Sequence, residues 1–142
     1  MIGLVLVTHG RLSEELIAAV KFVVGDRLPL KMEGVSLSPA EGFEDFTQRI
    51  RSAIEKIDEG DGVLLLTDMF GGTPSNVSLT FLEEKKVEVL SGVNLPMLLK
   101  LATLSSKVTL EEAVKIAESA GKENIIIASD LLRRRQMSTP TR

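Results

Sequence analysis

The sequence predicts an α/β domain built on a mostly parallel sheet. Short apolar runs of strand length alternate along the 142 residues with longer segments in which apolar residues recur at helical spacing. Several of the apolar runs are unbroken, as expected of strands that are covered by helices on both faces. The order of elements is β-α-β-α-β-α-β-α-α-β, and this alternation is typical of the α/β class. The length predicts one domain.

Five segments are expected to be strands. They span residues 2–7, 32–37, 62–67, 87–90 and 125–128. Five further segments are expected to be helices. They span residues 13–24, 38–57, 74–84 and 94–104, and a last segment that begins at Thr109. With right-handed crossovers, we expect a flavodoxin-like three-layer sandwich in which the strands lie in the order second, first, third, fourth.

Local signals predict where several of these helices begin and end. Ser38-Pro39-Ala40-Glu41 reads as a capping box with proline at the first helical position, and Thr109-Leu110-Glu111-Glu112 as a second capping box. Gly25 suits the C-terminal cap of the first helix.

Composition excludes several kinds of site. The chain has one His and no Cys, Trp or Tyr. Without cysteine there is no disulfide, thiol nucleophile or thiolate zinc cluster, and one histidine excludes a multi-histidine metal site within one chain. We therefore expect neither a metal nor a cofactor, and any imidazole chemistry must use His9.

Charge and hydropathy predict a cytoplasmic protein with no nucleic-acid partner. The net charge is −3, and residues 131–142 hold four Arg and no acid, so the preceding residues carry the acidic excess. We interpret residues 1–130 as the domain and residues 131–142 as a basic, disordered tail. The apolar start of the chain is far shorter than the ~20 residues that cross a bilayer, which predicts neither export nor membrane insertion.

The predicted topology brings His9 and Asp68 together. His9 follows the first strand and Asp68 ends the third. In such sheets, ligands bind beyond the carboxyl ends of the strands, where the strand order reverses. A carboxylate that accepts the imidazole N–H fixes which ring nitrogen is nucleophilic, and it stabilises the cation formed when the other nitrogen reacts. The simpler interpretation is a turn histidine with an ordinary hydrogen bond.

Two loops at the same edge of the sheet are further candidates. Gly10, Gly71 and Gly72 would let backbone N–H groups approach a phosphoryl group, to which Thr73 would offer its hydroxyl. The simpler interpretation is a tight turn into a helix, with Thr73 as N-cap and Pro74 as the first helical residue. No Gly-Lys-Ser/Thr follows, so this is not a Walker loop.

The segment after the fourth strand has two interpretations. It is either a strand-to-helix loop with Asn94 as N-cap, or a wall of the candidate site at the carboxyl ends of the strands. In the second case it would form a rim on which another protein docks. The candidates for that rim are Phe70, Asn94, Pro96 and Met97.

Three motifs together resemble a known family. Thr8-His9-Gly10, Asp68 with Gly71-Gly72-Thr73-Pro74-Ser75-Asn76, and Ser91-Gly92-Val93-Asn94-Leu95-Pro96-Met97 look like the IIA domain of the mannose-type sugar phosphotransferase system, over residues 1–130. The resemblance implies that His9 accepts a phosphoryl group from the phosphohistidine of the carrier HPr and passes it to a histidine of a IIB component. It further implies that Asp68 orients His9 and that Thr73, where relatives commonly have Ser, binds the phosphoryl group.

The resemblance also implies an assembly. Members of the family are homodimers in which a C-terminal strand, here Ile125–Ala128, pairs antiparallel with the partner's sheet. The membrane components IIC and IID would be reached only indirectly, through IIB. The transported sugar is not encoded in this domain.

Three other functions are open at this stage. The phosphocarrier subunit of dihydroxyacetone kinase shares the fold and the early histidine. A regulatory module would use the same site to control a partner through its phosphorylation state. A hydrolase that pairs His9 and Asp68 with a serine such as Ser75 is disfavoured, because the sequence has no Gly-x-Ser-x-Gly elbow.

Overall fold

Strand β1 (Gly3–His9) lies inside the sheet and is buried along its whole length up to the final residue, His9. The computed structural model describes residues 1–83 and 86–138. On one side β1 pairs with β2 (Met32–Leu37), and on the other with β3 (Val63–Thr67), beyond which lies β4 (Val87–Ser91). The pairings between these four strands are parallel and their order is β2-β1-β3-β4, which confirms the predicted order of the first four strands.

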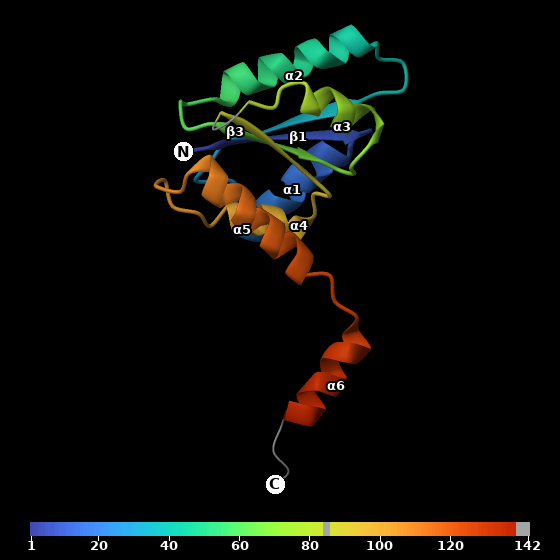
Figure 1. Cartoon of the computed structure of the whole chain (residues 1–142), viewed down its shortest axis with the longest axis vertical. Helices are drawn as coiled ribbons and strands as arrows, with labels where there is room; N and C mark the ends of the chain where they lie inside the picture. Colours follow the sequence, from blue (N-terminus) through green and yellow to red (C-terminus); the bar gives the residue numbers. More distant parts are fainter. Residues whose placement is uncertain (84–85, 139–142) are drawn as a thin grey trace.

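Two helical layers enclose this sheet, as Figure 1 shows. Leu4 and Leu6 of β1 face a core completed by α1 (Leu12–Val24), α4 (Leu95–Leu101) and α5 (Leu110–Glu123). Val5 and Val7 point the other way, toward α2 (Phe43–Ile57) and α3 (Gly72–Leu79). Because alternate side chains of a strand face opposite sides, the unbroken apolar run of β1 supplies both cores. No helix within the described residues is long and apolar enough to span a bilayer.

The predicted helix caps were partly right. Asn94 caps α4 by accepting the Met97 N–H at 3.0 Å, and Thr109 caps α5 by accepting the Glu112 N–H at 3.2 Å. Gly25 follows α1 with φ +96°, as expected for a C-terminal cap.

The predicted capping box at residues 38–41 was wrong, because α2 begins at Phe43 with Gly42 as N-cap. The Ser38 carbonyl instead accepts the Glu41 N–H at 3.1 Å, which closes a turn. The Glu41 carboxylate, which a capping box would need, accepts a hydrogen bond from Arg49 at 2.8 Å.

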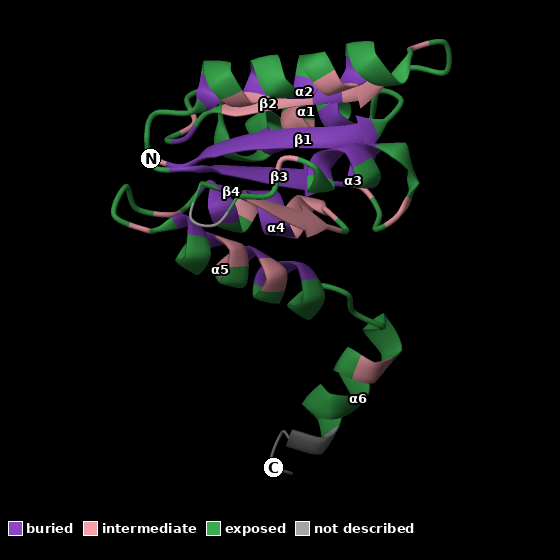
Figure 2. Ribbon diagram, turned by 45° about the horizontal axis from the view of Figure 1, so that its top comes forward, coloured by how far each residue is buried: buried purple, intermediate pink, exposed green. Residues whose placement is uncertain are grey.

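The C-terminal segment also differs from its prediction. Residues 125–127 have no regular secondary structure, and α6 (Ala128–Ser138) follows them and projects from the body of the protein (Figures 1 and 2). The described part of the sheet therefore contains no fifth strand, because this segment meets no sheet edge of its own chain. Residues 131–138 are helical rather than disordered, and residues 139–142 of the predicted tail lie outside the described residues.

Candidate functional site

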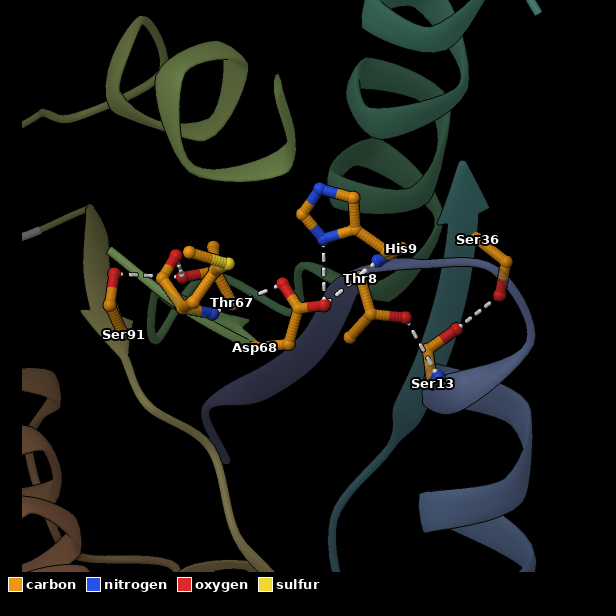
Figure 3. A network of polar contacts seen from close by, with 8 residues as sticks. Thr8, His9, Ser13, Ser36, Thr67, Asp68 and Ser91 are labelled. Atoms are coloured by element: carbon orange, nitrogen blue, oxygen red, sulfur yellow. Dashed lines mark hydrogen bonds and ion pairs between the residues drawn. The ribbon is translucent and has the colours of Figure 1, made fainter. Parts of the chain in front are cut away.

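His9 is the last residue of β1, at the carboxyl edge of the sheet. Its side chain is 47% exposed, whereas that of Asp68, directly after β3, is 13% exposed. Val7 of β1 pairs with Thr67 of β3, so the register of these parallel strands brings Asp68 alongside the end of β1. Figure 3 shows the Asp68 carboxylate facing the imidazole. The structure thus brings together the two residues that were predicted to lie at the same edge of the sheet.

Asp68 holds both the backbone and the ring of His9. Its Oδ2 accepts the His9 backbone N–H at 3.0 Å and lies 2.9 Å from Nδ1, while Oδ1 accepts the Met69 N–H at 3.1 Å. Because a carboxylate oxygen only accepts hydrogen bonds, the neutral ring carries its proton on Nδ1 and a lone pair on Nε2. Nε2 is therefore the ring nitrogen that keeps its lone pair.

Gly72 leaves open the space beside Nε2. A Cβ at Gly72 would lie 3.3 Å from Cε1 and 3.4 Å from Nε2 of His9, so a side chain there would crowd the ring. Gly72 has φ +80° and Gly71 has φ +89°, which favour glycine at both positions. Gly71 is the N-cap of α3, so the helix begins beside the imidazole, and the first backbone N–H groups of a helix have no partner within it.

Thr73 is the second residue of α3 and is exposed, and Pro74 follows as the third. The expectation that Thr73 caps the helix with Pro74 as its first residue was therefore wrong, because the chain turns one step earlier, at the glycines. Gly10, with φ +54°, turns the chain directly after His9, and its N–H donates to the Leu37 carbonyl at 2.8 Å.

Hydroxyl groups beneath the site fix the strand ends, and sequence reasoning did not find them. Thr8 Oγ1 accepts the Ser13 N–H at 2.8 Å, and the Ser13 and Ser36 hydroxyls lie 2.6 Å apart (Figure 3). On the other side, Thr67 Oγ1 donates to Ser91 Oγ at 2.7 Å. One signal in the sequence could have found these hydrogen bonds. A Ser or Thr lies at or beside the end of a buried strand, where an apolar residue would pack equally well, so the hydroxyl is expected to have a partner.

The predicted docking rim is only partly exposed. Phe70 is 76% exposed, and its neighbour Met69, which the prediction omitted, is 54% exposed. Met97, in contrast, is 3% exposed and packs closely against Gly121, so its assignment to the rim was wrong. Asn94 caps α4 and donates to the Gly121 carbonyl at 3.1 Å, which gives it a structural role. Pro96 is half-buried at the start of the same helix.

The family model EIIA-man, described as "PTS system fructose IIA component", matches residues 3–118. The chain belongs to the EIIA-man family. The matched range contains His9, Asp68 and the glycine loop that begins α3. The resemblance inferred from the motifs is thereby confirmed, and the dihydroxyacetone kinase subunit and the hydrolase are not favoured.

Individual relatives agree with the family match. The PTS system sorbose-specific EIIA component of Lacticaseibacillus casei is 32% identical over 112 residues, which cover 78% of this chain and 79% of that protein. The PTS system mannose-specific EIIAB component of Escherichia coli (strain K12) is 29% identical over 126 residues, or 87% of this chain. The matched region spans only 38% of that E. coli protein.

A solved EIIA-type structure has the same fold. Phosphotransferase system component EIIA from Streptococcus agalactiae superposes with a TM-score of 0.80 at 25% sequence identity. The superposition covers 92% of this chain and 99% of that one.

Proposed function

We propose that this EIIA-man protein is a phosphocarrier that accepts a phosphoryl group on Nε2 of His9 from phosphorylated HPr and passes it to a histidine of a IIB component during sugar uptake. The observation that carries the proposal is the position of Nε2. Asp68 occupies Nδ1 at 2.9 Å, while Nε2 faces Gly72 at the start of α3 in a half-exposed ring.

The chemistry needs no proton to leave Nε2. The lone pair of this nitrogen attacks phosphorus as the bond to the HPr phosphohistidine breaks, and the HPr imidazole leaves. His9 then keeps its Nδ1 proton and becomes cationic, and the nearby Asp68 carboxylate stabilises that charge. Transfer to IIB reverses these events. Such transfer depends mainly on in-line positioning and on donors around the phosphoryl oxygens.

The beginning of α3 supplies those donors in our proposal. Backbone N–H groups at Gly71 and Gly72, with the Thr73 hydroxyl, would bind the phosphoryl oxygens, because the start of a helix favours an anion. The Gly10 N–H already donates to the Leu37 carbonyl at 2.8 Å, so Gly10 would contribute by turning the chain after His9 and not as a donor. Both reaction partners are proteins, so the exposed Phe70 and the half-buried Pro96 would form part of a docking rim. The membrane IIC and IID components would be reached only through IIB, and the chain would act in the cytoplasm.

A homodimer completes the proposal, with residues 125–128 of one copy pairing antiparallel with β4 of the other. The two edges of the sheet differ. At the β2 edge, Arg49 donates to the Ser36 carbonyl at 2.9 Å, which blocks strand addition. At the β4 edge, Val87 is paired with Glu83 in an isolated antiparallel bridge, whereas farther along the Val89 N–H donates to the Glu88 carboxylate at 2.9 Å and, within the described residues, has no backbone partner. Three isoleucines available for pairing, Ile125, Ile126 and Ile127, are 78%, 53% and 66% exposed.

An intact-mass measurement tests the phosphocarrier function. Incubation with phosphoenolpyruvate, enzyme I and a compatible HPr is expected to add one phosphoryl group, in an acid-labile and alkali-stable form. The His9→Ala variant is expected to stay unmodified. The proposal would be overturned by an unchanged wild-type mass when the HPr used phosphorylates another EIIA-man protein, or by full labelling of His9→Ala.

A further inference from the structure

Thr67, the last residue of β3, ties the turn that carries Asp68 to the neighbouring strand. It is fully buried, and its Oγ1 donates to Oγ of Ser91, the last residue of β4, at 2.7 Å (Figure 3). Its carbonyl accepts the N–H groups of Gly92 and Val93 at 2.9 and 3.0 Å. Three hydrogen bonds therefore join the ends of β3 and β4 at the residue directly before Asp68.

The Thr67–Ser91 hydroxyl pair lies on the same face of the sheet as the His9 imidazole. Leu65 of β3 and Val7 of β1 belong to the core that faces α2 and α3. Because side chains alternate along a strand, Thr67 and His9, each two positions farther along, lie on that face as well. Val7 and Thr67 are also partners in the register of the two strands. A shift of the end of β3 would therefore change the surroundings of the imidazole.

The Asp68 carboxylate reaches His9 from a turn and not from within a strand, because β3 ends one residue earlier. The turn folds back over Thr67: the Met69 carbonyl lies 3.4 Å from Thr67 Oγ1, and the Met69 N–H donates to Asp68 Oδ1 at 3.1 Å. The contact of Asp68 Oδ2 with Nδ1, at 2.9 Å, tolerates little displacement, since hydrogen bonds weaken steeply as their geometry departs from the optimum.

We propose that Thr67 is a positioning residue of the phosphocarrier site. Its hydroxyl, bonded to Ser91, keeps the turn in the place from which the Asp68 carboxylate holds the proton on Nδ1 of His9. This inference rests on the proposed function and deepens it, because it gives a role in transfer to a buried residue that does not touch the reacting atoms. Without the hydroxyl the turn is free to shift, and the ring loses its fixed direction and its single protonated nitrogen.

The position of the imidazole proton in the unphosphorylated protein tests this role directly. With one histidine in the chain, ¹⁵N-labelled histidine reports on His9 alone, and its nitrogen shifts show which ring nitrogen carries the proton. Thr67→Val keeps the shape of the side chain and removes the hydroxyl. We expect it to raise the fraction of the Nε2-protonated form at least threefold. Thr67→Ser, which keeps the hydroxyl, should restore the wild-type fraction.

Transfer kinetics with a compatible HPr give a second measurement on the same variants. Thr67→Val is expected to lower kcat for phosphorylation at least fivefold and to leave the apparent KM for HPr unchanged, because docking does not involve a buried residue. Thr67→Ser should again restore the rate.

The two hydroxyls are expected to act as one unit. Ser91→Ala removes the acceptor, and the freed Thr67 hydroxyl can turn to the Met69 carbonyl, so this variant should be slowed less than Thr67→Val. The double variant should be no slower than Thr67→Val alone, because loss of one partner already removes the interaction. Losses that multiply would show that the hydroxyls act independently, and would overturn the pairing.

Thr103→Val is the matched control. Thr103 Oγ1 donates to the Lys100 carbonyl, also at 2.7 Å, at the end of α4 opposite to Asn94. The substitution removes a hydroxyl hydrogen bond of the same length and is expected to change neither the proton position nor kcat. Thermal unfolding followed by circular dichroism checks that both valine variants are folded.

The outcomes separate this inference from the phosphocarrier function. If wild-type protein is phosphorylated and Thr67→Val keeps both its Nδ1 proton and its rate, the role of Thr67 is overturned and the phosphocarrier function stands. A slower rate with an unchanged proton position also overturns it, as does an equal effect of Thr103→Val. If HPr does not phosphorylate the wild type, the proposed function fails, while the proton position still decides whether Thr67 holds Asp68 against His9.

Discussion

At the scale of single residues, the two imidazole nitrogens of His9 have different surroundings, and the proposed transfer depends on that difference. One oxygen of Asp68 contacts both the ring and the backbone N–H of His9, at 2.9 and 3.0 Å. Rotation of the ring would break the first contact, and movement of the strand end would break the second. Nε2 is thus held in one direction, toward Gly72, before any partner arrives.

Removing the Asp68 carboxylate should therefore slow transfer. For Asp68→Ala we expect phosphorylation by HPr to be at least tenfold slower, equivalent to about 1.4 kcal/mol of barrier, because ring orientation and cation stabilisation are both lost. Stopped-time mass spectrometry gives the rate, and circular dichroism checks the fold. A rate within a factor of about two of the wild type would contradict the orienting role.

The two adjacent glycines provide a matched pair of variants. Gly71→Ala and Gly72→Ala both place a side chain at positive φ, and each should cost about 1–3 kcal/mol of stability. Only at Gly72 would the new Cβ contact the His9 ring, at 3.3 and 3.4 Å from Cε1 and Nε2. At Gly71, within the described residues, it would meet no atom within 4 Å apart from those of its immediate chain neighbours. Phosphorylation of Gly72→Ala should consequently be at least tenfold slower than that of Gly71→Ala. Equal rates would show that space beside Nε2 is unimportant.

At the scale of elements, parallel pairing explains why residues 59 positions apart meet. β1 and β3 point the same way, so their carboxyl ends lie at one edge, and the α3 turn begins from that edge. This arrangement could be predicted from the sequence, because unbroken apolar runs locate both strands and the polar residues that follow locate the site.

Residues near the fourth strand were harder to assign from the sequence. An Asn before a helix can cap that helix or face a partner, and the sequence is the same in both cases. The hydrogen bond to Gly121, from a helix 27 positions later, decides for the structural role of Asn94. The misread capping box at residues 38–41 has a similar cause, because the long-range contact between Glu41 and Arg49 is invisible in local spacing.

Asn94 and Phe70 should accordingly show opposite effects. We expect Asn94→Ala to lower the free energy of unfolding by about 1–2 kcal/mol through loss of the cap, with transfer from HPr unchanged. Phe70→Ala should leave stability within about 0.5 kcal/mol, because the ring is exposed, but should weaken productive docking and raise the apparent KM for HPr. Chemical denaturation and transfer kinetics measure the two effects. Reversed behaviour would place Asn94, and not Phe70, in the docking rim.

At the scale of the whole molecule, the C-terminal segment was the least predictable part of the fold. The spacing of its apolar residues indicates a strand, yet a short strand is stable only when it pairs with an edge. In the single chain residues 125–127 have no such edge, and α6 follows them. Local sequence therefore indicates a strand that residues 125–127 do not form in the single chain, and in the proposed dimer the edge that they need comes from a second copy.

The whole-molecule account requires one phosphorylated nitrogen in a chain with one histidine. Because His9 is the only imidazole, ¹⁵N labelling of histidine gives a spectrum from this ring alone. After phosphorylation by HPr, nuclear magnetic resonance is predicted to show phosphorus coupled to Nε2, with the proton retained on Nδ1. Phosphorus attached to Nδ1, or a phosphorylated protein whose imidazole is unmodified, would contradict the account.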